Sequence, residues 1–261
     1  MFARAFWLAF LVLTSWAGAQ PLRVAVATTL ADSGLFEVLA EDFEPSGGAR
    51  LILIPAGSGQ GLDMLARGDV DAAVIHAPGL EAQALATGEI TDGGCFAYNW
   101  FVIAGPEADP ARVGSSTSIQ EAFARIANSQ SLFVSRGDHS GTHEKELELW
   151  RAAGVSPRGV WYLEVGTGAG AALLLAAERE AYLLIDQGTL ASVRLRPKSK
   201  TLYQSDEPFI LNRYRILLNS SQARPIAQYL VSPAAQKIIS SFGGGNKFFS
   251  WTGECGDLGD H

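Results

Sequence analysis

The stretch FVSRGDHSGTHEKELELW, from Phe133 to Trp150, begins as a short apolar run and ends in a helical pattern. Between the two lies a polar turn that carries Arg136, Ser140, Thr142 and two glycines. This order predicts a buried strand that leads straight into the start of a helix, the repeating unit of an α/β fold. Because the N-terminus of a helix has free N–H groups and a partial positive charge, such a turn also favours the binding of an anion.

The same alternation of strand-like and helix-like stretches continues on both sides of this turn. Short apolar runs that end in polar or glycine-rich residues include LRVAVATT (22–29), ARLILIPAGSG (49–59), DAAVIHAP (71–78), WYLEV (161–165) and AYLLI (181–185). Helical spacing follows several of them, and Ser118 and Glu121 form a capping box before one such stretch. We therefore predict an α/β protein with mostly parallel sheets and helices on both faces.

Polar residues collect where the predicted strands end. They are Thr28, Thr29 and Ser33; Gly57, Ser58 and Gly59; Ser135, Arg136, Ser140 and Thr142; Gly166 to Gly170; and Asp186. Ligands of parallel α/β sheets bind beyond the carboxyl ends of the strands. Hydroxyl groups, backbone N–H groups and one arginine are donors that suit an anion, so this pattern favours an anion site over a set of unrelated helix caps.

Two long apolar strands, near residues 96–104 and 208–219, bracket the middle of the chain. Such a pair indicates a chain that crosses into a second lobe and later returns. We place the first lobe at residues 20–100 and 208–261 and the second lobe at residues 101–207.

The first 19 residues read as a secretory signal peptide. Arg4 supplies the positive charge, an apolar run follows, and Ala17-Gly18-Ala19 is a small-residue cleavage site. The alternative is a single membrane-spanning helix, but the apolar run is short for a bilayer. We therefore expect export to the periplasm.

Charge and cysteine content narrow the possible partners. The formal net charge is −7, which argues against a nucleic acid or an anionic membrane surface. Two cysteines, Cys95 and Cys255, would reach an oxidising compartment after export. One disulfide is the natural expectation there, and two unpaired buried thiols are the alternative.

The polar turn also invites two enzymatic interpretations. GDHSG is similar to the nucleophile stretch of serine proteases, with Ser140 as nucleophile and His139 or His143 as base. A triad needs a base oriented by a third group, and no matching histidine context occurs elsewhere. A metal site at the two histidines has the right i,i+4 spacing but lacks a third ligand.

A glycine-rich segment suggests a third enzymatic interpretation. Gly166, Gly168 and Ala171 match the dinucleotide-binding pattern after a strand, and Asp186 follows at about the expected distance. The position in the middle of the chain and the export signal both oppose a nicotinamide cofactor. The same turn can equally serve a small anion at a helix start.

Successive blocks of the sequence, from about Ala27 to Thr189, resemble the tungstate-binding proteins of bacterial ABC transporters, relatives of the molybdate- and phosphate-binding proteins. The blocks are ATTLADSGL, GSGQGLDMLARGDVDAAVIHAP, YNWFVIAGPEADPA, AFARIA, FVSRGDHSGTHEKELELW, WYLEVGTGAGAALLLAAERE and AYLLIDQGT. The block around Arg136 is the most specific of them, and the C-terminal part is similar more loosely.

The resemblance implies a two-lobed periplasmic binding protein fold of type II, which closes over a tetrahedral oxyanion between its lobes. It implies no catalysis and no cofactor, with an ABC permease as partner and a monomeric binding protein. The residues that would hold the oxyanion are Thr28, Thr29, Ser58, Arg136, Ser140, Gly141, Thr142, Thr167 and Gly168.

Three positions depart from the family pattern. Ala169 replaces a bulkier methionine, Gln187 replaces an arginine, and Trp100 replaces an aspartate. These departures bear on ligand identity and affinity more than on the fold.

Tungstate and molybdate carry only acceptor oxygens at neutral pH, so a site of donors suits them. Phosphate keeps a proton near pH 7 and would gain from a carboxylate acceptor, which Asp138, Asp186 or Asp32 could supply. The sequence therefore predicts tungstate or molybdate and leaves phosphate, and a sensor rather than a transport role, as alternatives.

Overall fold

The computed structural model describes residues 20–193, 199–245, 247–251 and 253–255. The predicted signal peptide, residues 1–19, lies outside these residues. Within the described ranges, the helices are all too short or too polar to cross a membrane.

The larger sheet has the strand order β10-β4-β9-β3-β1-β2. Its strands are β1 (Leu22–Ala27), β2 (Leu51–Ala56), β3 (Ala72–Ile75), β4 (Thr91–Pro106), β9 (Leu211–Leu218) and β10 (Phe249–Ser250). Along β1, Val24 and Val26 face one apolar core and Ala25 faces another, so both faces of the sheet are buried.

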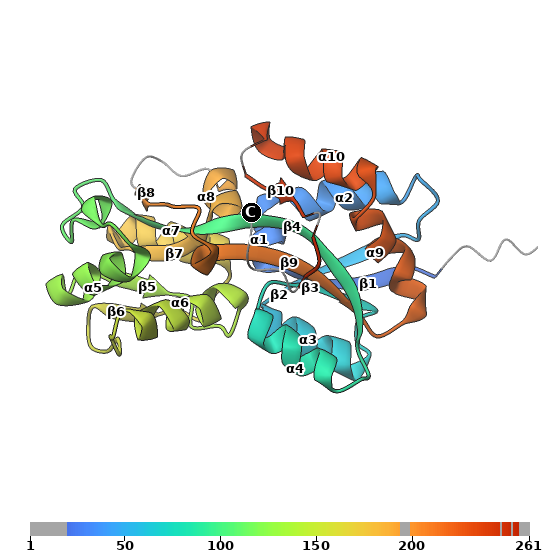
Figure 1. The fold of residues 1–261 in the computed structure, drawn as a ribbon, viewed down its shortest axis with the longest axis horizontal. Coiled ribbons are helices and arrows are strands. Elements are labelled where there is room, and N and C mark those ends of the chain that lie inside the picture. The colour runs from blue at the N-terminus through green and yellow to red at the C-terminus, as the bar shows by residue number, and fades with distance from the viewer. Residues whose placement is uncertain (1–19, 194–198, 246, 252, 256–261) are drawn as a thin grey trace, which may run out of the picture.

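Helices cover both faces of this sheet (Figure 1). One layer contains α2 (Leu35–Phe43), α9 (Arg224–Leu230) and α10 (Pro233–Ser241), and the other contains α3 (Ser58–Arg67) and α4 (Pro78–Ala86). Short 3₁₀ turns complete the fold at η1 (Val113–Ser115), η2 (Pro208–Ile210), η3 (Ser221–Ala223) and η4 (Phe242–Gly244).

A second group of elements lies beyond the far end of β4 (Figure 1). Its strands are β5 (Phe133–Ser135), β6 (Tyr162–Glu164), β7 (Leu183–Asp186) and β8 (Ser199–Tyr203), and its helices are α5 (Ile119–Ser129), α6 (Gly141–Ala152), α7 (Ala169–Arg179) and α8 (Gln187–Ser192). The α5 helix begins as its capping box predicts, because Ser118 Oγ accepts a hydrogen bond from Glu121 N at 3.1 Å.

Two long strands join the two groups. β4 pairs with β9 from Thr91 to Trp100, and from Phe101 onward it pairs with β7 and β8. This arrangement is the two-lobed α/β fold that the sequence predicts. We propose that the lobe boundaries lie where the pairing of β4 changes, at residues 100/101, and before β9, at residues 207/208.

Strand pairing is more mixed than the expected mostly parallel sheets. Among the named strands, parallel pairs are β1–β2, β1–β3 and β5–β6, and the other pairs are antiparallel. The reason is that β4 and β9 carry the chain between the lobes in opposite directions, and each of them pairs with several neighbours.

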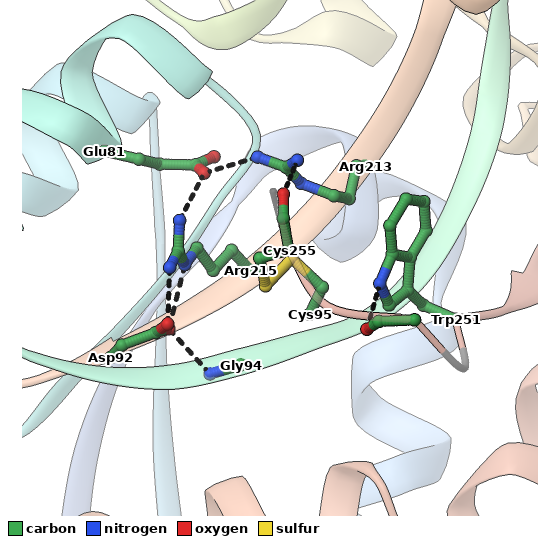
Figure 2. The surroundings of a disulfide bond; sticks show 9 residues. Glu81, Asp92, Gly94, Cys95, Arg213, Arg215, Trp251 and Cys255 are labelled. Atoms are coloured by element: carbon green, nitrogen blue, oxygen red, sulfur yellow. Dashed lines mark hydrogen bonds and ion pairs between the residues drawn. A yellow bond between two sulfur atoms is a disulfide. The ribbon is translucent and has the colours of Figure 1, made fainter. Parts of the chain in front are cut away.

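A disulfide between Cys95 on β4 and Cys255 attaches the C-terminal segment to the larger sheet (Figure 2). The prediction of one disulfide is therefore confirmed. Beside it, the Arg213 guanidinium donates to the carbonyl oxygen of Cys255 and lies 2.9 Å from Glu81 Oε2. The same cluster of side chains contains Glu81, Asp92, Arg213 and Arg215.

Candidate functional site

Arg136 lies at the centre of the contact between the two lobes. It directly follows β5 and is 1% exposed. Its Nη2 donates to Thr28 Oγ1 at 2.8 Å, and its Nη1 donates to Thr142 Oγ1 at 3.3 Å. Its Nε donates to the carbonyl oxygen of Thr167 at 3.4 Å. Thr28 begins α1 (Thr28–Ser33) in the first lobe, so one guanidinium group binds both lobes.

Asp138 holds this arginine and the start of α6 together. Its Oδ2 lies 2.5 Å from Arg136 Nη2, while its Oδ1 accepts from Ser140 Oγ at 2.6 Å and from Ser140 N at 3.2 Å. Ser140 is the N-cap of α6 and accepts from His143 N at 3.3 Å. Both carboxylate oxygens of Asp138 are thus occupied by protein donors.

The first lobe contributes two further hydroxyl groups, both fully buried. Thr29 Oγ1 accepts from the Tyr214 hydroxyl at 3.1 Å. Ser58 begins α3, and its Oγ accepts from His76 N at 3.4 Å. These two hydroxyl groups are bonded to the first lobe and to β9, not to Arg136.

Glycines allow the two lobes to approach closely at this point. A Cβ atom at Gly141 would lie 2.4 Å from the carbonyl oxygen of His76, so no other residue fits without movement of the backbone. Gly59 N donates to the carbonyl oxygen of His139 at 3.4 Å. Gly168 is less restricted, because a Cβ atom there would lie at an ordinary contact distance of 3.7 Å from Thr28 Cγ2.

The structure thus gathers the sequence-predicted residues along the surface between the lobes. Thr28, Thr142 and Thr167 contact Arg136 directly, and Ser140 is joined to it through Asp138. Thr167 takes part through its backbone, since its N also donates to the carbonyl oxygen of Arg136 at 3.3 Å. Their role in binding an anion stays a prediction.

A buried polar network between the crossing strands was not foreseen from sequence. Asn212 Nδ2 donates to Asn99 Oδ1 at 2.7 Å and to the Tyr214 hydroxyl at 2.8 Å. His76 Nδ1 donates to Asn212 Oδ1 at 2.8 Å. Burial lowers the pKa of His76 to about 4, so the imidazole is neutral at pH 7. The available signal was one asparagine inside each long apolar strand.

Asp186, the acid of the dinucleotide pattern, belongs to the same network. It is fully buried and accepts from Asn99 Nδ2 at 2.9 Å and from Thr189 N at 3.0 Å. Burial raises the pKa of its carboxyl group. The N-terminus of α7 is also engaged, because Gly170 N donates to Asp32 Oδ2 at 2.7 Å. This geometry leaves Asp186 inaccessible to a ribose hydroxyl group.

The side chains around Ser140 do not form a catalytic triad. Its hydroxyl bonds to Asp138 and not to an imidazole, while His143 Nδ1 accepts from His139 N at 3.1 Å. In the part of the chain that the structure describes, no group of three His, Cys, Asp or Glu residues could hold a metal ion. The hydrolase and metal interpretations therefore receive no support from the geometry.

Two α/β lobes joined by two crossing strands, with a polar site between them, define a solute-binding protein. Residues 15–237 match the PBP superfamily domain, and the chain belongs to this superfamily. Within it, the chain belongs to the family of the tungstate-binding proteins of ABC transporters, as the following relatives show.

The tungstate-binding protein TupA of Peptoclostridium acidaminophilum is 30% identical over 231 residues, which cover 84% of this chain and 80% of that one. The structure of the tungstate ABC transporter from Geobacter sulfurreducens is 36% identical, with a TM-score of 0.76 over 85% of this chain and 99% of the other. The tungstate-binding protein TupA of Desulfovibrio alaskensis G20 is 32% identical, with a TM-score of 0.72 over 90% of this chain and 100% of the other.

Proposed function

We propose that this protein captures tungstate or molybdate in the periplasm and presents it to an ABC permease. The observation that carries the proposal is Arg136, a buried guanidinium that contacts Thr28 of one lobe and Thr142 of the other. A doubly charged anion among these donors would gain several charge-assisted hydrogen bonds, each worth about 1.5–3 kcal/mol. The relatives named above support tungstate as the ligand.

The carboxylates near the site favour a fully deprotonated oxyanion over phosphate. A protonated phosphate needs an acceptor for its remaining hydrogen. Asp138 already accepts from Arg136 and Ser140, and Asp186 is buried among its own donors. The third candidate, Asp32, accepts from Gly170 N. Donors are therefore better supplied at this site than acceptors, which suits an anion that carries only acceptor oxygens.

The hydroxyl group of Thr29 is oriented so that it can donate a hydrogen bond to a ligand. Because Tyr214 donates to Thr29 Oγ1, the proton of the Thr29 hydroxyl is available for another acceptor. Tyr214 in turn accepts from Asn212, so the direction of this chain of hydrogen bonds is set by groups on β9. An oxyanion oxygen is the acceptor that we propose for Thr29.

Closure of the two lobes over the anion is the proposed mechanism, with β4 and β9 as the hinge and no covalent step. Two hydrogen bonds already join the lobes, from Gly170 N to Asp32 Oδ2 and from Gly59 N to the carbonyl oxygen of His139. We propose that opening breaks them and closure restores them. We propose that the protein works as a monomer, because one chain contributes both halves of the site.

Calorimetric titration of the anion-stripped mature protein with tungstate, molybdate, sulfate and phosphate tests the proposal. We expect tight one-to-one binding of tungstate or molybdate and no heat from phosphate. Tight phosphate binding would instead support the phosphate-binding relatives as the functional model. Absence of binding to all four anions, together with turnover of ester substrates, would reject the binding role.

A further inference from the structure

Glu146 is a buried carboxyl group that lies next to the proposed anion site and takes no part in it. It is 1% exposed and forms no ion pair among the described residues. The Tyr162 hydroxyl donates to its Oε1 at 2.8 Å, and Trp150 Nε1 donates to the same oxygen at 3.1 Å. Burial raises the pKa of Glu146 from 4.5 to about 7, and these donors offset only part of that effect.

Glu146 lies close to the proposed anion site because it is on the same helix as Thr142. It follows Thr142 by four residues on α6, so the two side chains share one face of the helix, about one turn of 5.4 Å apart. Thr142 contacts Arg136 directly. An ionised Glu146 would therefore add a negative charge in a buried region one turn from a residue that we propose as a ligand of the anion.

We propose that Glu146 couples oxyanion binding to proton binding, so that the protein holds its anion more tightly when this carboxyl group is protonated. The inference rests on the function proposed above and concerns how pH regulates oxyanion binding at the same site. A doubly charged anion favours the neutral form of a nearby acid, and by linkage the neutral acid favours the anion to the same extent. Because water screens buried charges little, the coupling does not require direct contact.

Other charged and titratable groups near α6 have to be separated from Glu146. On α6 itself, burial lowers the pKa of His143 and so favours its neutral imidazole. β6 carries Tyr162 and Glu164, and β5 leads into Arg136. Of the remaining neighbouring elements, α5 carries Glu121 and Arg125, which pair with each other, and β7 carries Asp186. Each of these groups is unchanged in a variant of Glu146 alone.

Calorimetric titration of the mature protein with tungstate at about pH 6 and about pH 8.5 tests the coupling. We expect the wild-type affinity to be roughly tenfold weaker at the higher pH, a typical size for coupled sites. Glu146→Gln should bind equally tightly at both values, because the amide keeps the acceptor for Tyr162 and cannot ionise. Glu148→Gln is the matched control on the same helix and should keep the wild-type pH dependence.

A second variant serves if Glu146→Gln does not fold. Tyr162→Phe removes a donor that favours ionised Glu146, so the loss of affinity should move to higher pH. The inference is overturned by equal wild-type affinities at both pH values, or by a Glu146→Gln protein with the wild-type pH dependence. It is equally overturned if Tyr162→Phe leaves the profile in place. Absence of tungstate binding at either pH would reject the proposed function, and the coupling with it.

Discussion

Among single residues, Arg136 shows how one side chain can serve both structure and binding. Its guanidinium group is buried, and its N–H groups bond to four acceptors: a carboxylate, two hydroxyl groups and a carbonyl oxygen. Asp138 holds the arginine and caps the amide of Ser140 at the same time. Because these bonds already hold the planar guanidinium group in place, little side-chain freedom is left for it to lose when an anion binds.

Removal of this side chain should reduce oxyanion binding strongly. We expect Arg136→Ala to weaken tungstate binding by about 2 kcal/mol or more, from the loss of one charged donor in a closed site. Calorimetry at neutral pH measures the effect. Arg179→Ala, at the exposed end of α7, is the control and should bind as the wild type does. Unchanged affinity in Arg136→Ala would contradict the proposed site.

Glu146 should also leave a signature in stability. Its pKa is about 7 in the folded protein and about 4.5 in the unfolded chain, so folding retains a proton in this window. The stabilisation is complete below the unfolded value and is lost as pH rises through the folded value. Relative to wild type, Glu146→Gln should gain up to about 3 kcal/mol in the free energy of unfolding between about pH 4.5 and 8.5.

Denaturant unfolding of both proteins at the two ends of that range measures this difference. A constant difference between Glu146→Gln and wild type at all pH values would show that folding does not raise the pKa of Glu146.

Among the secondary-structure elements, the start of α6 decides whether the lobes can close. Ser140 caps the helix, and Gly141 at its first position lies against the carbonyl oxygen of His76 in the other lobe. Local helix geometry therefore tolerates a larger residue, whereas the contact between the lobes does not.

A single methyl group at this position should weaken binding without weakening folding. We expect Gly141→Ala to keep or raise the melting temperature, since alanine favours helices, and to weaken tungstate binding at least tenfold by preventing full closure. Gly79→Ala in the first turn of α4 is the matched control, because a Cβ atom there meets no neighbour within 4 Å. Calorimetry and thermal unfolding of both variants make the comparison, and full affinity in Gly141→Ala would show that this contact does not limit closure.

For the molecule as a whole, the disulfide joins two distant parts of the chain. Cys95 and Cys255 are 160 residues apart in sequence, so the bond restricts a large loop in the unfolded state. We expect Cys95→Ala with Cys255→Ala to lower the free energy of unfolding by about 2–4 kcal/mol. Tungstate affinity should change little, because the bond lies away from Arg136. Denaturation of wild type with and without reductant tests this, and equal stability in both would contradict it.

The fold was largely predictable because its signals are local. Apolar runs that end in polar turns indicated the strands, and Ser118 and Ser140 marked helix starts that the structure confirms. Two long apolar strands indicated the passage between lobes. Strand direction was less predictable, since an apolar run looks the same whether its neighbour runs parallel or antiparallel to it, and β4 and β9 are antiparallel to their neighbours.

The candidate site was predictable as a set of segments but not as a geometry. The sequence by itself determined the α/β class, the helix starts and the supply of hydroxyl groups, because periodicity and capping act within a few residues. Only the tertiary structure decided that Arg136 meets Thr28, 108 residues away, that Asp138 is fully engaged, and that Asn99 and Asp186 lie in one buried network. Hydrogen bonds depend on distances and directions to within fractions of an ångström, and the packing of the two lobes sets those for residues far apart in the chain.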